Sequence, residues 1–303
     1  MSVSWSFSPA ALLRQHHARD AAQTMGPLPD DVTETPFPPS GLFRGGLMAD
    51  PHTRRGQDVI VYFHGGGFIA GGPETHRHVT AWLAHMTGLR VLSARYRLVP
   101  EHPFPAQADD AVAACRAMLA VIGEDTGIFL AGDSAGACVS LWGLHRMTVA
   151  ERQKVRGLIL FYGGYGQVES ESITRRGTAE NGLDSGTLSI MYDRLRGAGP
   201  EGNPVWPTAF ASRITQPAYV VAAERDAIFD DSIRLFHAIE GQNPHSRLVI
   251  VPDQDHSFLK GAGQDPTAQI ELARASTWIG TLTAQGPLST PGPGDRPAHA
   301  LHS

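Results

Sequence analysis

With 303 residues, 42% of them hydrophobic, the chain is long enough to bury a large core in one domain and to carry a small cap beside it. Its 25 basic and 30 acidic residues give a formal net charge of −5, and no basic run stands out, which excludes a nucleic-acid partner. No apolar run reaches the length of a membrane span, and the first residues lack the basic start and apolar core of a signal peptide. We therefore expect a cytoplasmic protein with no membrane span.

Short apolar runs alternate with helical patterns along the chain. Runs bounded by turn residues predict strands at residues 58–63, 127–131, 158–162, 218–223 and 247–251. Apolar residues at near-helical spacing predict helices at 106–121 and 267–282, with another near 188–195. Strands that alternate with helices form a mainly parallel sheet flanked by helices, so the expected fold class is α/β.

The first predicted strand ends in the run His64-Gly65-Gly66-Gly67-Phe68. Taken alone, this run reads equally well as a flexible loop. Because it follows a strand and precedes the serine turn described next, we interpret the backbone N–H groups of Gly66 and Gly67 as part of an oxyanion hole. His64 and Gly65 are then expected to support the loop.

The second predicted strand ends in the turn Gly132-Asp133-Ser134-Ala135-Gly136, and a small, then apolar, segment follows. This is the setting of a nucleophile elbow, in which a Gly-x-Ser-x-Gly turn between strand and helix pushes the serine hydroxyl above the sheet. An ordinary glycine turn is the alternative, but the strand before it and the helix after it argue against that interpretation. We predict that Ser134 is the nucleophile and that the N–H of Ala135 completes the oxyanion hole.

A serine hydroxyl needs a neighbouring base, and the base needs an orienting carboxylate. The predicted strand at 218–223 ends in a segment that contains Asp226, and the one at 247–251 runs into a turn that contains His256. In this architecture the chain order is serine, acid, histidine. We therefore assign Asp226 as the acid and His256 as the base.

Four other residues compete for these roles. Glu224 stays open as the acid, because strand ends read from sequence carry errors of about two residues. Asp230 and Asp231 stand where a helix begins, so N-terminal capping explains them. His245 precedes its strand and would lie at the wrong end of the sheet.

A third motif, Tyr96-Arg97-Leu98-Val99-Pro100-Glu101-His102-Pro103-Phe104-Pro105-Ala106, lies between the glycine run and the elbow. With it, the chain resembles the hormone-sensitive-lipase-like branch of the α/β-hydrolases, also called family IV bacterial esterases, from about residue 59 to residue 281. The resemblance implies an α/β-hydrolase fold with a small helical cap. It also implies a structural role for Arg97, Glu101 and His102. The chain departs from the family pattern at three positions. Ala137 stands in place of a glycine after the elbow, Ala227 in place of a proline after the acid, and Ser257 in place of a glycine after the histidine. None of these changes removes a reacting atom.

The resemblance also implies a division of the chain. We expect residues 56–285 to form the catalytic domain with a cap insertion at about 163–216, and residues 1–55 to belong to the cap. Residues 286–303 are rich in glycine and proline and are expected to be a disordered tail. Four side chains are candidates for the substrate pocket, with ordinary packing as the alternative for each: Phe68, Met191, Trp206 and Phe210.

These features predict a serine carboxylesterase that acts on a small-molecule ester through an acyl-serine intermediate. Short to medium acyl chains are expected from the resemblance. No cofactor is expected and no metal, because histidine pairs such as His76 and His78 lack a carboxylate or cysteine cluster at ligand spacing. Cys115 and Cys138 are expected to be free thiols in buried helices.

Three alternatives stay open at this point. The same triad serves an amide or formamide hydrolase and a lactone hydrolase. From another class, some proteins that resemble this family bind a small ligand without turnover. The presence of His256 after its strand argues against that last alternative. A homodimer is among the assembly states left open.

Overall fold

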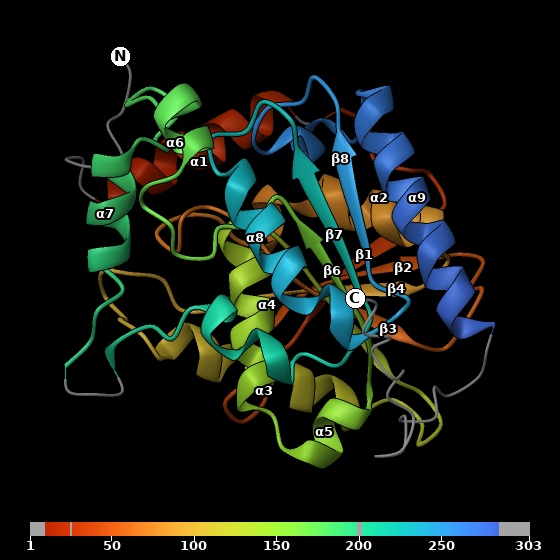
Figure 1. The fold of residues 1–303 in the computed structure, drawn as a ribbon. Coiled ribbons are helices and arrows are strands. Elements are labelled where there is room, and N and C mark those ends of the chain that lie inside the picture. The colour runs from red at the N-terminus through yellow and green to blue at the C-terminus, as the bar shows by residue number, and fades with distance from the viewer. Residues whose placement is uncertain (1–9, 25, 199–201, 285–303) are drawn as a thin grey trace, which may run out of the picture.

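The structure, a computed structural model, describes residues 10–24, 26–198 and 202–284, and its centre is an eight-stranded sheet (Figure 1). The strands lie in the order β1-β2-β4-β3-β5-β6-β7-β8. β1 pairs antiparallel with β2, and β2 with β4, while the other neighbouring pairs are parallel. In chain order the strands are β1 (Val32–Phe37), β2 (Gly46–Pro51), β3 (Val59–Phe63), β4 (Arg90–Ala94), β5 (Ile128–Asp133), β6 (Val155–Phe161), β7 (Ala218–Ala223) and β8 (Arg247–Val251).

The central strands are buried on both faces. Every residue of β3, β5 and β7 is buried. Neighbouring side chains of β3 enter different cores, since Val61 packs in one and Ile60 in the other. A strand covered on both faces needs apolar side chains at successive positions, which explains the continuous apolar runs in the sequence.

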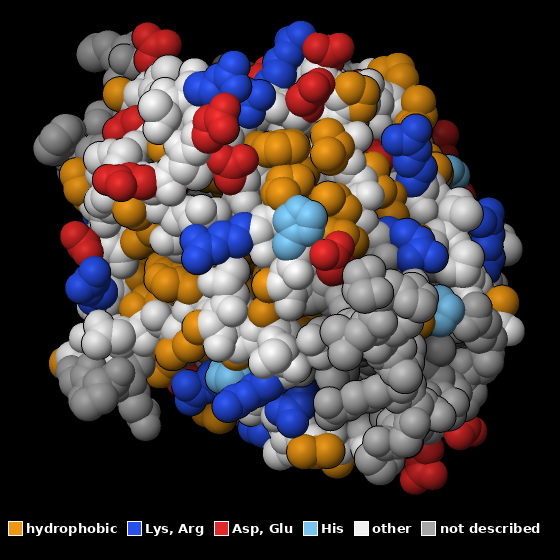
Figure 2. Space-filling view, in the orientation of Figure 1, with side chains coloured by type: hydrophobic (Ala, Val, Ile, Leu, Met, Phe, Trp, Pro, Cys, Tyr) orange, Lys and Arg blue, Asp and Glu red, His pale blue; other side chains and the backbone are white. Residues whose placement is uncertain are grey.

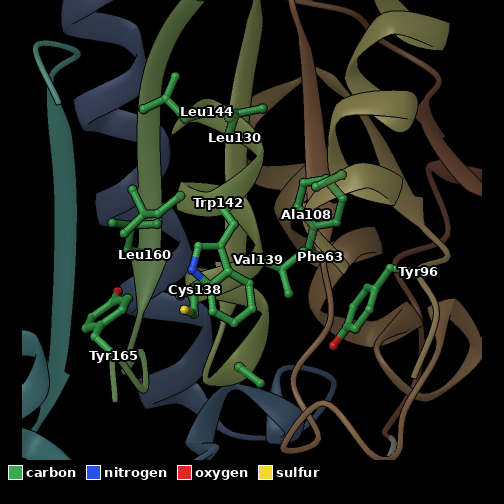
Figure 3. Close-up of a cluster of buried hydrophobic side chains, with 14 of the residues drawn as sticks. Phe63, Tyr96, Ala108, Leu130, Cys138, Val139, Trp142, Leu144, Leu160 and Tyr165 are labelled. Carbon is green, nitrogen blue, oxygen red and sulfur yellow. The ribbon is translucent and has the colours of Figure 1, made fainter. Parts of the chain in front are cut away.

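Two layers of helices cover the sheet (Figure 1). α2 and α9 pack together on the side of Ile60, and α3, α4 and α8 supply the other core. Figure 3 shows part of that second core, where Cys138, Val139 and Trp142 project from α4. The helices are α1 (Ala10–Thr24), α2 (Arg77–Thr87), α3 (Ala106–Leu119), α4 (Ala135–Arg146), α5 (Val149–Gln153), α6 (Glu171–Arg176), α7 (Ser185–Asp193), α8 (Phe229–Ile239) and α9 (Pro266–Thr283).

The predicted fold class is confirmed. β7 and β8 have the predicted bounds, and α3 and α9 lie within two residues of the predicted helices. The strand predicted at 158–162 begins earlier, as β6, and the helix predicted near 188–195 begins earlier, as α7. Residues 286–303, for which a disordered tail is predicted, lie outside the described residues.

The assignment of residues 1–55 to the cap needs a correction. Within this segment β1 and β2 belong to the central sheet, where β2 pairs with β4. β2 covers the second edge of β4, and β1 in turn pairs with β2 at the end of the sheet. In the described part of this segment, α1 lies outside the sheet. It contacts the short helices η1 (Pro73–Thr75) and η5 (Phe258–Gly261).

Charged side chains of both signs are interspersed on the face shown in Figure 2, with hydrophobic side chains gathered in small groups between them. Among the helices that the structure describes, none combines the length and the apolar composition needed to cross a membrane.

Candidate active site

The turn between β5 and α4 holds Ser134 in a strained conformation, with φ 52° and ψ −124°. The two glycines of the turn are required by close backbone approach. A Cβ atom on Gly136 would lie 2.0 Å from the carbonyl oxygen of Phe63, and one on Gly132 would lie 2.5 Å from the carbonyl carbon of Gly136. The turn therefore packs α4 directly against β3 and leaves the serine at the carboxyl end of β5.

Three residues from separate strand ends form a continuous hydrogen-bonded chain. His256, in the turn after β8, donates through Nδ1 to Oδ2 of Asp226 at 2.7 Å. The hydroxyl of Ser134 then donates to Nε2 of His256 at 2.9 Å. Asp226 is buried in the turn after β7, where its Oδ1 accepts from the backbone N–H of Ile228 at 2.9 Å. This arrangement fixes the tautomer in which Nε2 of His256 can accept a proton.

An aromatic ring holds the imidazole from one side. The ring of Tyr162 meets that of His256 edge to face, with 5.3 Å between centroids. Tyr162 follows β6, is buried, and has a φ of 37°. Its strained backbone and its packing against the imidazole restrict how His256 can turn.

The competing residues are engaged elsewhere. Glu224 accepts from the backbone N–H of Asp253 at 2.9 Å. Asp230 accepts from the backbone N–H of Ser172 at 2.8 Å. Asp231 accepts from the backbone N–H of Tyr165 at 2.7 Å, and its burial raises its pKa to about 7.

The last competitor, His245, comes before β8, at the opposite end of that strand from His256. Its carbonyl oxygen accepts from the indole N–H of Trp278 on α9 at 2.8 Å. This contact gives His245 a place in the packing of the helical layer, remote from the nucleophile.

The glycine loop after β3 bends back toward Ser134. Gly66 and Gly67 have φ values of 117° and 60°, which an L side chain adopts with strain. A Cβ on Gly66 would lie 2.3 Å from the carbonyl oxygen of Ala70. Within the described residues, no acceptor is recorded for the N–H groups of Gly66, Gly67 or Ala135, which leaves these donors available to a bound oxygen.

Buried polar contacts support this loop. The N–H of Gly65 donates to Oδ1 of Asp133 at 2.9 Å, and Nδ1 of His64 donates to the carbonyl oxygen of Gly65 at 2.8 Å. The hydroxyl of Tyr96 donates to the carbonyl oxygen of His64 at 2.8 Å, and the two rings stack at 4.3 Å. Burial lowers the pKa of His64 to about 3, so its ring is neutral and acts as a brace.

Hydrogen bonds made by Arg97, Glu101 and His102 hold the segment at 96–106 in place. Arg97 donates from Nε and Nη2 to the carboxylate of Asp110 on α3, each at 2.9 Å. Glu101 accepts from Arg14 on α1 at 2.6 and 2.9 Å. The carbonyl oxygen of His102 accepts from the side chain of Gln107 at 2.7 Å.

Ser134, His256, Gly66 and Gly67 line a single cavity of about 290 Å³. Of the four predicted pocket side chains, Met191 on α7 also lines it. Ser134, His256 and the glycine loop therefore face the same small space, while Asp226 is buried and does not line it.

The other three pocket predictions need a correction. Phe68 packs against Trp142 with ring centroids 5.4 Å apart, and Trp206 packs against the same ring at 5.7 Å. Phe210 is buried and stacks on His145 at 4.1 Å. None of the three lines the cavity beside Ser134. Phe68 and Phe210 are buried in the core, and the half-buried Trp206 lines a different pocket.

Several lining residues have no counterpart in the sequence-based prediction. They are His17, Asn181, Gly182, Leu183, Arg225, Asp255 and Lys260. His17 comes from α1, more than a hundred residues before the elbow, and no local pattern signals such an approach. Lys260 and Asp255 flank His256 in sequence, so their closeness to the histidine is the one signal that could have found them.

No group of three or more His, Cys, Asp or Glu side chains among the described residues is arranged to hold a metal ion. Cys115 and Cys138 are buried free thiols, which confirms the prediction made for them.

Comparisons with known proteins agree with this fold. A family described as "alpha/beta hydrolase fold" matches residues 60–260. An acetyl esterase of Salmonella schwarzengrund is 31% identical over 216 residues, which cover 67% of this chain and 66% of that protein. The chain thus spans about two thirds of the length of this relative.

Two solved structures are similar over nearly the whole chain. A hormone-sensitive lipase from a metagenome library is 26% identical, with a TM-score of 0.78 over 91% of this chain and 92% of its own. An esterase of Pyrobaculum calidifontis is 22% identical, with a TM-score of 0.76 over 92% of this chain and 94% of its own. From its sheet, its elbow and these matches, the chain belongs to the α/β-hydrolase family, in the hormone-sensitive-lipase-like branch.

Proposed function

We propose that this chain is a serine carboxylesterase that hydrolyses short- to medium-chain acyl esters through an acyl-serine intermediate. The observation that carries the proposal is the hydrogen-bonded chain from Asp226 through His256 to Ser134, at 2.7 and 2.9 Å, at the wall of a cavity. The similarity to an acetyl esterase supports it.

The mechanism follows from the order of these hydrogen bonds. As Oγ of Ser134 attacks the ester carbonyl carbon, Nε2 of His256 takes the hydroxyl proton. The carboxylate of Asp226 stabilises the imidazolium that forms. His256 then gives the proton to the departing alcohol oxygen, which leaves an acyl group on Ser134. A water molecule then attacks the acyl carbon as it passes a proton to Nε2 of His256. When the bond from the acyl carbon to Oγ of Ser134 breaks, His256 returns this proton to Oγ, and the carboxylic acid leaves.

The negative charge on the carbonyl oxygen is stabilised by backbone donors. We assign this role to the N–H groups of Gly66, Gly67 and Ala135, which have no recorded acceptor within the described residues. Each such donor contributes about 3 kcal/mol to transition-state stabilisation. His64 and Gly65 act as positioning residues, since they hold the loop through Tyr96 and Asp133.

The size of the cavity supports a small acyl group. Its volume of about 290 Å³ lies just below the range of roughly 300–1,000 Å³ typical of small-molecule pockets. Residues 163–216, which contain α6 and α7, and the helix α1 are proposed as the cap over it. A cytoplasmic location is part of the proposal, and a homodimer is one of the assembly states compatible with it.

Rates on a panel of esters test the function directly. We expect p-nitrophenyl acetate and butyrate to be hydrolysed with a higher kcat/KM than the dodecanoate, because the cavity limits the acyl chain. A matched anilide should react at least tenfold more slowly, since an amine is a poorer leaving group than a phenol. An anilide rate equal to the ester rate would favour the amide hydrolase, and hydrolysis confined to lactones would favour the lactone hydrolase. Binding of these esters with no hydrolysis at all would favour a protein that binds a small ligand without turnover.

The assignment of the acid is tested by a matched pair of variants. Asp226→Asn should lower kcat by about 10⁴-fold, because an amide at this place no longer holds the required tautomer of His256. Glu224→Gln should leave kcat unchanged, since Glu224 accepts only from the backbone of Asp253 among the contacts recorded for it. Both rates can be measured with p-nitrophenyl acetate. A large loss in Glu224→Gln with activity kept in Asp226→Asn would reverse the assignment.

A further inference from the structure

A lysine ammonium group faces the same cavity as the nucleophile. Lys260 lies on the short 3-10 helix η5 (Phe258–Gly261), four positions after His256, and lines the cavity together with Ser134. It is one of two lysines in the chain. The other, Lys154, lies before β6 and donates to the backbone carbonyl of Glu124 at the surface.

The partner recorded for Lys260 carries no charge. Nζ of Lys260 lies 3.3 Å from Nε2 of His17 on α1. Burial, together with the neighbouring charge of Lys260, lowers the pKa of His17 to about 2, so this imidazole is neutral. A neutral ring accepts one hydrogen bond from an ammonium group, which has three to donate.

The carboxylates around Lys260 act on it from a distance. Burial lowers the pKa of Lys260, and the charges of Asp133 and Asp20 oppose this shift because they favour the ammonium form. Neither carboxylate is within hydrogen-bonding distance of Lys260 in the structure. Asp255 also lines the cavity and has no recorded bond to Lys260. The other cation at this wall, Arg225, pairs with Asp253 at 2.5 Å. Within the described residues, Lys260 is thus a half-buried cation without a paired carboxylate.

Desolvation of a charged group in the wall of a cavity raises the free energy of the protein unless a counterion lies beside it. In a catalytic cavity of about 290 Å³, the molecule that occupies the space in front of Ser134 also lies beside Lys260. We propose that Lys260 recognises a carboxylate on the substrate, so that the preferred esters carry an anionic group close to the ester bond. This inference rests on the proposed esterase function and names its substrate class.

Two pairs of matched esters test the inference, one for each side of the ester bond. Monomethyl glutarate and methyl pentanoate differ by a carboxylate on the acyl side, and 4-acetoxybenzoate and phenyl acetate differ by one on the alcohol side. For each pair the measured quantity is the ratio of kcat/KM for the anionic ester to that for the neutral ester, corrected for the rate with hydroxide alone. We expect a ratio well above one for at least one pair.

Variants of the two lysines then identify the source of the preference. Lys260→Gln should lower that ratio by about tenfold to a hundredfold, mainly through KM, which is the range expected for a hydrogen bond to a charged group. Lys260→Arg should retain part of the preference. Lys154→Gln removes the same charge far from the cavity and should leave the ratio unchanged. A merely structural lysine would change both esters of a pair equally and leave the ratio as it is.

A second measurement covers the case in which Lys260→Gln does not fold. Reductive methylation of the wild-type protein should be slowed at Lys260 by added glutarate, while Lys154 in the same sample reacts at an unchanged rate. Ratios near one for both ester pairs, or equal methylation of Lys260 with and without glutarate, would overturn the inference. If neutral esters are still hydrolysed in a Ser134-dependent manner, the esterase function stands without it. If no ester is hydrolysed, both fail.

Discussion

Replacing Ser134 with alanine is expected to lower kcat for p-nitrophenyl acetate by roughly 10⁵- to 10⁶-fold, since the variant lacks the hydroxyl that His256 activates and that forms the acyl intermediate. The hydroxyl makes one recorded hydrogen bond, to His256. Its removal therefore leaves the elbow and the oxyanion donors in place. The residual rate should reflect binding and oxyanion stabilisation alone.

The same change at another serine provides the control. Ser276 on α9 donates to the backbone carbonyl of Met86 at 2.7 Å, on the face of the sheet covered by α2 and α9. Ser276→Ala should keep wild-type kcat, and both variants should unfold in denaturant close to the wild-type midpoint. A Ser134→Ala protein that is folded and fully active would remove Ser134 from the mechanism.

Replacing Gly136 with alanine is expected to destabilise the fold by about 3 kcal/mol or more and to abolish activity. The added Cβ would lie 2.0 Å from the carbonyl oxygen of Phe63 and 2.6 Å from that of His64. Both obstacles are backbone atoms of β3 and the loop after it, so no side chain can move aside and α4 must shift away from the sheet. Such a shift displaces Ser134 from His256.

Gly280 offers a matched control in another helix. A Cβ on Gly280 of α9 meets nothing within 4 Å, so Gly280→Ala should raise the free energy of unfolding by up to about 1 kcal/mol through helix propensity alone. Denaturant unfolding followed by circular dichroism measures both variants. Wild-type stability in Gly136→Ala would contradict the close approach of α4 to β3.

The parts of the fold that could be predicted from sequence are those whose residues carry a local signal. β7 and β8 follow predicted apolar runs, and the elbow follows a fixed spacing of glycine and serine. β1 carries no such signal, since Val-Thr-Glu-Thr-Pro-Phe is largely exposed and contains a proline. Its place as a strand depends on pairing with β2, a contact between separate segments that no local pattern specifies.

The residues of the site also separate into those that carry a local sequence signal and those whose position depends on tertiary packing. The meeting of Ser134, Asp226 and His256 could be predicted because each follows a strand, and parallel strands bring their carboxyl ends to one edge of the sheet. The pocket predictions failed for Phe68, Trp206 and Phe210, since large aromatic side chains also serve in packing. Here Phe68 and Trp206 pack against Trp142, and Phe210 stacks on His145. The pairing of Lys260 with His17, 243 positions apart, is set by tertiary packing alone.

Covalent labelling tests the central claim most directly. Treatment of the wild-type protein with a p-nitrophenyl alkylphosphonate, followed by peptide mass spectrometry, should give one adduct per chain, located on Ser134, with loss of esterase activity in parallel. The Ser134→Ala protein should remain unlabelled. An adduct on a different residue that accompanies the loss of activity, or full hydrolysis by a protein that takes up no label, would contradict the account.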